Sequence, residues 1–170
     1  MDRDFKAEII ALLDEHRIMT IATVRHDGWP QATVVSYANE GLTLYCMLGL
    51  NTQKHLNIVR DPRVSVAISG DYQQPMQYKG LSLADRATIS EDDDEIDRVR
   101  GIVLSRHPTY KELPAPDPAR IGVLCLTPDV VSIIDYSKGF GHSDLVRVSH
   151  DAQIEHIEAL RHHWAGLHAA

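Results

Sequence analysis

The stretch from Ile18 to Leu48, IMTIATVRHDGWPQATVVSYANEGLTLYCML, contains three short apolar segments separated by two turns. Segments 18–24, 31–37 and 42–48 have the length of β-strands and are rich in β-branched and aromatic residues. Asp27-Gly28 is a strong hairpin signal between the first two segments, and Asn39-Glu40-Gly41 supplies the second turn. Two consecutive hairpins predict an antiparallel sheet.

The same pattern continues along the chain. Residues 64–68 and 81–90 are expected to form a fourth and a fifth strand, and two more are expected around the turn at 127–129. Helices are expected only near residues 5–16, 51–60, 90–107 and from 151 onward, where Ile154, Ile157, Leu160, Trp164 and Leu167 share one helical face. Closely spaced strands with few helices favour a barrel over a doubly wound parallel sheet. We expect a mainly β fold with flanking helices.

Composition limits the classes of function. The chain has 170 residues, with 44% hydrophobic and 24% charged residues, which is typical of one globular domain. Seventeen Lys and Arg against 24 Asp and Glu give a net charge of −7, which argues against general nucleic-acid or membrane-surface binding. No secretory leader or membrane-spanning run is evident, and Cys46 and Cys125 lie in apolar segments. We expect a cytoplasmic protein with buried, reduced thiols.

Residues Gly49 to Ile58, GLNTQKHLNI, predict a helix with an unusual beginning. Asn51 or Thr52 can cap it, but its first turn contains Lys54 and no acid. A cation is unfavourable there because the helix dipole is positive at that end. The later helix has the usual arrangement: Ser90 as the expected cap, followed by the acids of residues 91–95. Lys54 is therefore either a partner for a bound anion or a solvated lysine beside an ordinary cap.

The segments DGWPQATVVSY (27–37) and LTLYCMLGLNTQKHLNIVRDPRVSVAI (42–68) resemble the flavin-binding split-barrel proteins typified by pyridoxamine 5′-phosphate oxidase. They share an Asp-Gly-x-Pro hairpin, a Ser/Thr-x-Lys helix start and a Pro-Arg-Val-Ser break at matching spacing. The resemblance implies a six-stranded antiparallel, Greek-key split barrel, a homodimer, and FMN in a groove at the dimer interface. It divides the chain into an FMN-binding domain at 1–149 and a C-terminal helix at 150–170 that packs on the barrel or on the partner.

The resemblance also implies site residues. In the family, the strand after the Pro lines the flavin, and the loop after the third strand holds its phosphate. Carried across, the residues beside the ring and ribityl chain are Thr33, Val34, Val35 and Ser36, and those along the chain and phosphate are Met47, Leu48, Asn51, Thr52, Gln53 and Lys54. Lys79 falls where the family places a polar side chain against the ring, and Tyr136 falls near where it brings aromatic residues to the flavin.

Some positions depart from the family pattern. Pyridoxamine phosphate oxidases have Arg where this chain has Thr33, and an Arg-Lys pair where it has Gln53-Lys54. They also have an Arg-x-His pair for the substrate, whereas Phe140 stands two residues before His142 here. The B6-phosphate site is therefore not expected, although the flavin site is retained in reduced form.

Other residues leave alternatives open. The ten histidines show no ligand spacing with carboxylates or cysteines, so no metal site is expected. His142 is either a haem ligand, as a C-terminal histidine is in some split-barrel relatives, or a loop histidine bound to backbone groups. Tyr136, Phe140 and Trp29 either cover a ring system or pack in the core or the dimer.

The sequence indicates a cofactor more clearly than a reaction. The first expectation is an FMN-dependent oxidoreductase acting on an unidentified small molecule, with reduced nicotinamide as the electron donor. A deazaflavin-dependent reductase is a variant of it, because Thr33 replaces an Arg. The alternatives are a non-catalytic flavin-binding stress protein and a haem-binding split barrel. In flavin enzymes the cofactor carries the redox chemistry, so the lack of an obvious acid or base leaves an oxidoreductase open.

Overall fold

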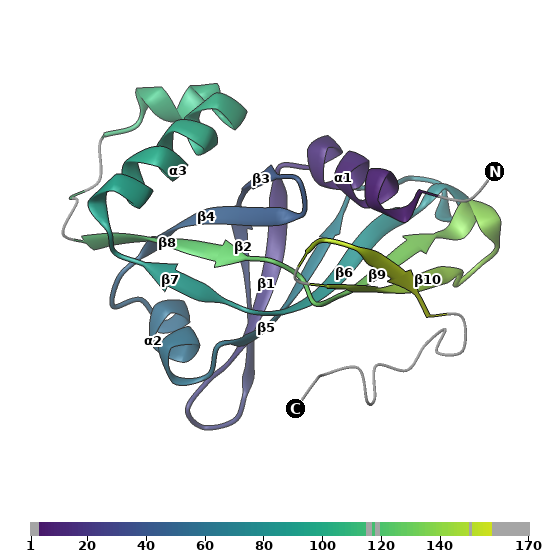
Figure 1. Cartoon of the computed structure of the whole chain (residues 1–170), viewed down its shortest axis with the longest axis horizontal. Coiled ribbons are helices and arrows are strands. Elements are labelled where there is room, and N and C mark those ends of the chain that lie inside the picture. The colour runs from purple at the N-terminus through teal and green to yellow at the C-terminus, as the bar shows by residue number, and fades with distance from the viewer. Residues whose placement is uncertain (1–3, 115–116, 118–119, 150, 158–170) are drawn as a thin grey trace.

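The computed structural model describes residues 4–114, 117, 120–149 and 151–157 (Figure 1). The helices are α1 (Phe5–Glu15), α2 (Gln53–Arg60) and α3 (Asp93–Arg106), with 3₁₀ turns η1 (Pro75–Gln77), η2 (Pro108–Glu112) and η4 (Tyr136–Lys138). The strands are β1 (Ile18–Val24), β2 (Pro30–Ser36), β3 (Ala38–Glu40), β4 (Thr43–Gly49), β5 (Arg63–Ser69), β6 (Lys79–Arg86), β7 (Thr88–Ser90), β8 (Ile121–Leu126), β9 (Val130–Asp135), β10 (Ser143–Val148) and β11 (Ile154–His156).

These strands form two sheets, and every pairing between them is antiparallel. The larger sheet has seven strands in the order β11-β10-β9-β6-β5-β1-β2, and the smaller has four in the order β3-β4-β8-β7. The expected mainly β, antiparallel split barrel is confirmed. There are more strands than the six that the family resemblance implies, and three of them, β3, β7 and β11, are only three residues long.

The inner faces of the two sheets share one hydrophobic core. Ile21, Ile68 and Ile133 of the large sheet and Leu44 and Leu124 of the small sheet are each at most 1% exposed and belong to it. The inward residues alternate along the strands, as in β5, where every second residue is buried. This alternation explains why a pattern of period two located most strands correctly.

The connection between the sheets runs through Ala87. Residues 81–90 were expected to form one strand, but this is wrong: β6 belongs to the large sheet and β7 to the small one. Ala87 is buried between them, and its N–H donates to the carbonyl of Pro62 at 2.8 Å. The chain therefore changes sheets while remaining extended, and the hydrophobic pattern continues because both strands border the same core.

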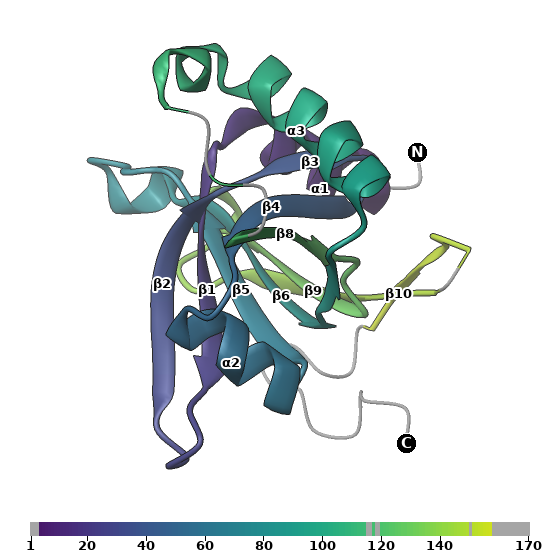
Figure 2. The ribbon, with the colours of Figure 1, turned by 90° about the vertical axis from the view of Figure 1, so that its left-hand side faces the viewer.

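Helices α2 and α3 lie at opposite edges of the molecule (Figures 1 and 2). The buried face of α3, with Ile96, Val99 and Val103, packs on Ile121 and Val123 of β8 in a second cluster. The cap of α3 is Asp92, whose carboxylate accepts from the N–H of Glu95 at 3.0 Å, so the expected Ser90 cap is wrong. The Ser90 hydroxyl instead accepts from the N–H of Asp92, because Ser90 still belongs to β7.

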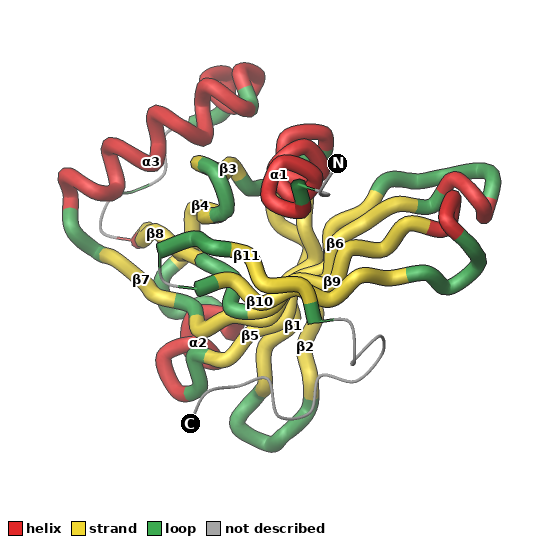
Figure 3. The backbone as a smooth tube through the Cα atoms, turned by 45° about the vertical axis from the view of Figure 1, so that its right-hand side comes forward, coloured by secondary structure: helices red, strands yellow, loops and turns green. Residues whose placement is uncertain are grey.

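The end of the described chain extends the large sheet. A helix was expected from residue 151 onward, but residues 154–156 form β11, which pairs antiparallel with β10 through Val148↔Ile154 (Figure 3). Over these residues the helix prediction is wrong, because Ile154 packs against the core as part of a sheet. The remainder of the expected helix, residues 158–170, lies outside the described residues.

Among the described residues, no helix is both long and apolar enough to cross a membrane.

Candidate functional site

The loop before α2 has a defined conformation. Thr52 is the N-cap: its hydroxyl accepts from the N–H of His55 at 3.3 Å and donates to the carbonyl of Gly49 at 2.8 Å. Asn51 has a φ of 62°, a left-handed conformation that asparagine tolerates better than most residues, and its N–H donates to Nδ1 of His55 at 3.1 Å. Of the two residues expected to cap this helix, Thr52 does so.

The first turn of α2 carries an uncompensated positive charge. It contains no acidic residue, and among the described residues no hydrogen bond or ion pair involves the half-buried Lys54 ammonium. Burial raises the pKa of the Cys46 thiol to about 11, and the positive charge of Lys54 opposes that shift. The first amides of a helix have no intrahelical acceptor, so amides and ammonium together favour an anion.

Buried hydrogen bonds hold α2 against the β1–β2 hairpin. The amide of Asn57, 1% exposed, donates to the Thr23 hydroxyl at 3.0 Å and to Gln31 Oε1 at 2.9 Å. Gln53 donates to Asn57 Oδ1 at 2.8 Å, so its side chain is already committed to this network. Asn57 was not among the residues predicted from the sequence. A polar residue on the buried side of an amphipathic helix, next to Ile58, could have indicated a buried hydrogen-bond network.

The four candidates of β2 divide between its two faces. Thr33 and Val35 face inward, opposite Ile21 and Met19, and Val35 packs against the main core. Val34 faces outward and is 63% exposed on the edge strand of the large sheet. The Ser36 hydroxyl is hydrogen-bonded to the Tyr110 hydroxyl of η2. The side chains of these residues therefore cannot all contact one face of a ligand.

Met47 and Leu48 likewise point to opposite sides of β4. Leu48 is 1% exposed in the main core, so only its backbone is available to a ligand. Met47 is half-buried and packs with the α3 cluster. Neither side chain lies with Lys54 in a common open site, although their strand leads directly into the loop that Thr52 caps.

Lys79 and Tyr136 lie at the other end of the large sheet. Lys79 begins β6, whose last residue, Arg86, pairs with Arg63 just after α2. The eight residues of β6 span roughly 23 Å, so Lys79 is far from that end. The loops after β5 and β9 project at the right of Figure 1, while α2 lies at the lower left. One copy of the chain therefore does not bring Lys79 and Tyr136 to the start of α2.

Lys79 is held in place by a buried acid. Its ammonium lies 3.6 Å from Oδ2 of Asp135, which is directly opposite in β9. Burial alone would raise the pKa of the Asp135 carboxyl, but hydrogen bonds from Ser137 and the charges of Lys79 and Lys138 outweigh burial and hold that pKa below its usual value. The Asp135 carboxylate therefore stays charged and holds the Lys79 ammonium in place.

Tyr136 belongs to a row of aromatic rings beside this pair. Its ring centroid lies 5.3 Å from that of Tyr78 and 5.2 Å from that of Phe140, and Tyr78 lies 5.9 Å from Tyr72. Phe140 is 80% exposed between two glycines with positive φ. Tyr136 and Phe140 therefore pack on each other at the surface of the chain rather than in its core.

His142 has a partner that limits its role as a ligand. Its Nε2 lies 3.0 Å from Oδ2 of Asp144. A haem-binding histidine commonly ligates iron through one ring nitrogen while the other is hydrogen-bonded. Here Asp144 takes Nε2, so His142 could ligate an iron only through Nδ1.

The family model for pyridoxamine 5′-phosphate oxidase matches residues 5–134. The chain belongs to this family. The match covers the α2 loop, β6 and all but the last residue of β9, and thus most of the candidate site.

Relatives within this fold have diverse names. General stress protein 26 of Bacillus subtilis (strain 168) is 29% identical over 69 residues, which are 41% of this chain and about half (49%) of that protein. A haem-binding protein from Mycobacterium smegmatis has a TM-score of 0.69 at 23% identity, with 86% of this chain and 60% of that one covered. A pyridoxamine 5′-phosphate oxidase-related, FMN-binding protein from Nostoc punctiforme PCC 73102 has a TM-score of 0.64 at 16% identity, with 93% and 100% covered. At these identities the structural matches establish the fold alone.

Proposed function

We propose that this protein is an FMN-binding oxidoreductase acting on a small molecule, with the 5′-phosphate of FMN at the start of α2. The observation that carries the proposal is the first turn of that helix, where Lys54 has no acid beside it. A dianionic phosphate would gain from the free backbone amides and from the ammonium together, on a loop that the Thr52 hydroxyl holds in shape. The FMN-binding relative from Nostoc supports a flavin in this fold.

The remaining candidates fit a cofactor shared between two copies. Lys79 and Tyr136 are about a strand length from α2 within one chain, so they can reach the same flavin only from a second copy. Val34 and Ile18 lie on the same outer face at the sheet edge and are 63% and 55% exposed, which offers an apolar surface for that copy. We therefore propose a homodimer that completes the site.

When bound, FMN would supply the redox chemistry. In this proposal the backbone N–H groups of Gln53 and Lys54 orient the phosphate and the Lys54 ammonium neutralises it, while the Thr52 hydroxyl, bound to the Gly49 carbonyl, holds the loop in place. The backbone of the edge strand β2 forms a wall that excludes water from one side of the ring. Lys79 of the second copy, fixed by Asp135, presents a positive charge to the polar edge of the ring. The small-molecule substrate and the electron donor, reduced nicotinamide in the proposal, enter from the open side.

The purified protein tests this proposal directly. We expect flavin absorbance at about 450 nm, FMN identified by mass after release from the denatured protein, and oxidation of reduced nicotinamide in the presence of an acceptor. A Soret band would identify a haem-binding split barrel, and a released deazaflavin would replace FMN as the cofactor. Bound FMN without turnover by any donor would indicate a non-catalytic flavin protein, in line with the name of the Bacillus relative.

A further inference from the structure

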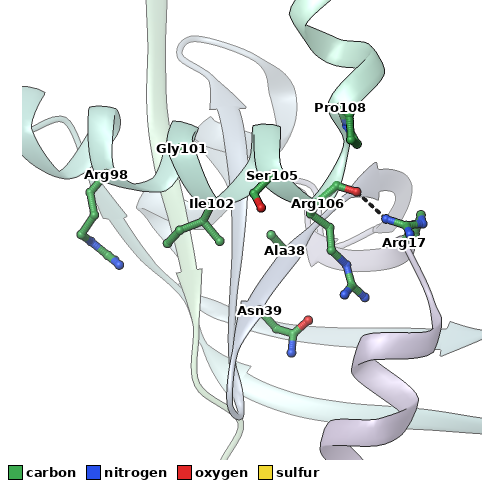
Figure 4. A pocket seen from close by; sticks show the side chains of 9 residues that line it. All are labelled: Arg17, Ala38, Asn39, Arg98, Gly101, Ile102, Ser105, Arg106 and Pro108. Carbon is green, nitrogen blue, oxygen red and sulfur yellow. Dashed lines mark hydrogen bonds between the residues drawn. The ribbon is translucent and has the colours of Figure 1, made fainter.

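A second concave site lies away from α2, between α3, β3 and the α1–β1 connection (Figure 4). The cavity has a volume of about 710 Å³, which is in the range of sites for small organic molecules. It begins at Ala38, beyond the end of β2, whereas Gln31 near the beginning of β2 contacts α2. Seven residues of extended chain separate the two sites by roughly 20 Å. The cavity is therefore distinct from the proposed phosphate site.

Three arginines line the cavity, in a protein whose net charge is −7. Arg98 is paired with Glu95 and Glu40 at 2.8 Å, and Arg106 lies 3.9 Å from Asp14. Arg17 has no acidic partner among the described residues; its guanidinium donates only to the carbonyl of Arg106. Its remaining N–H groups form a planar fork suited to a carboxylate or a phosphate.

The polar groups at the base of the cavity are only partly satisfied by the chain. Nε of Arg106 and Oδ1 of Asn39 are buried and have no hydrogen-bond partner. The Ser105 hydroxyl, which points from α3 into the cavity, is in no hydrogen bond among the described residues (Figure 4). Arg106 Nε and Asn39 Oδ1 are covered by the chain itself, so of these polar groups the exposed Ser105 hydroxyl is the one open to a ligand.

Gly101 provides an independent observation. It lies in the interior of α3, where glycine is less favourable than alanine, and it lines the cavity. A Cβ added at this position would meet no atom within 4 Å. The packing of the chain therefore does not require a glycine here, although its absence of a side chain keeps the cavity open. A larger side chain at this position would project beside the cavity.

We propose that this cavity binds a small organic oxyanion, a carboxylate or phosphate carried on an apolar body. Arg17 and Ser105 bind the head group, with the positive charge of Arg106 beneath it. Ile102 and Pro108, which also line the cavity, contact the apolar body. The site is independent of the proposed flavin function and lies on a different helix.

Calorimetric titration with phenyl phosphate tests the proposal. The protein carries Lys54→Glu, so that the start of α2 cannot account for the binding. We expect saturable binding of one molecule per chain, weakened at least tenfold by Arg17→Ala. Arg17→Lys keeps the charge but not the planar fork, and it should be intermediate. Arg100→Ala, on the same helix but outside the cavity, is the matched control and should bind like its parent.

Gly101→Leu separates cavity blocking from loss of fold. Leucine is a better helix former than glycine, so the melting temperature should stay level or rise by about 2–4 °C, while phenyl phosphate binding is lost. Benzoate and inorganic phosphate identify the head group and the role of the apolar body. Saturable binding of either organic probe supports the proposal. Three results would overturn it. Neither organic probe binds at millimolar concentration, or binding is unchanged in Arg17→Ala and Gly101→Leu, or inorganic phosphate binds as tightly as the organic probes.

Discussion

Lys54 is the residue whose replacement separates cofactor binding from helix stability. Lys54→Glu places a carboxylate where the phosphate is proposed, so FMN affinity should fall more than tenfold, about 1.4 kcal/mol. The stability of the apoprotein should be unchanged or slightly higher, because an acid suits the first turn of a helix. Flavin fluorescence titration and thermal melts of the apoprotein measure the two effects.

Arg60→Glu is the matched control on the same helix. Arg60 lies in the last turn of α2 and donates to the carbonyl of Val24 at 2.7 Å. The same charge reversal should lower stability there and leave FMN affinity nearly unchanged. Wild-type FMN affinity in Lys54→Glu would place the phosphate elsewhere and make Lys54 a solvated surface residue.

Phe140 carries the prediction about the B6 substrate. According to the family resemblance, the arginine that binds the substrate phosphate stands at this position. Here it is replaced by Phe140, whose ring centroid lies 5.2 Å from that of Tyr136. The lost Arg–phosphate contact is worth a few kcal/mol, so oxidation of pyridoxamine 5′-phosphate should be negligible. Turnover comparable to that of a true pyridoxamine phosphate oxidase would show that the substrate site has been misplaced.

Asp85 makes stability depend on pH. Burial raises the pKa of its carboxyl to about 7 from an ordinary value of 3.8; the Arg86 and Thr127 amides oppose the shift and Asp129 adds to it. Because the folded protein keeps a proton that the unfolded chain releases, stability should fall as pH rises from about 4 to about 7 and then level off. Asp85→Asn cannot ionise, so it should melt higher than wild type at pH 8 and close to wild type at pH 4. An equal effect at both values would contradict this.

At the scale of elements, the cap of α3 can be tested by comparing two neighbours. Asp92 caps the helix through the N–H of Glu95, so Asp92→Ala should destabilise the protein by about 1 kcal/mol in urea titrations. Ser90→Ala loses only a turn hydrogen bond at the end of β7 and should cost less. The reverse order would restore Ser90 as the cap.

Local pattern predicted most of the strands, and tertiary contacts decided the rest. The alternation of apolar and polar residues located β1, β2, β4 and β5, because one face of each strand is buried in a common core. It could not show the change of sheets at Ala87, since an extended chain leaves one sheet and enters the other without a turn residue. β10 was missed, and β11 was mistaken for a helix because Ile154 and Ile157 fit a helical spacing as well.

The part of the candidate site that lies within one short segment of sequence was predictable. Thr52 and Lys54 belong to one short segment whose capping and charge are legible in sequence. The opposite orientations of Met47 and Leu48 follow from strand geometry, but which face is covered depends on α3, which comes much later in the chain. The distance from Lys54 to Lys79 depends on sheet order, which no local pattern contains.

At the scale of the whole molecule, light scattering tests the homodimer. We expect a particle of twice the 19.0 kDa chain mass at micromolar concentration. Ile18→Glu, on the exposed outer face of β1, should shift it toward monomer because burying an unpaired carboxylate is costly. Leu113→Glu, at a similarly exposed position in the loop after η2, is the control and should remain dimeric. A wild-type monomer would defeat the dimer proposal.

The order of strands in the two sheets also governs how the protein emerges from the ribosome. β4 pairs with β8, which is synthesised more than seventy residues later, and β6 pairs with β9. At ordinary translation rates the edge of β4 waits on the order of ten seconds for its partner. During that interval Leu44, Cys46 and Leu48 have no completed core, so we expect the nascent chain to bind chaperones until β8 has been made. Synonymous codon changes that slow translation between α2 and β8 would lengthen this exposure without altering a single residue of the native protein.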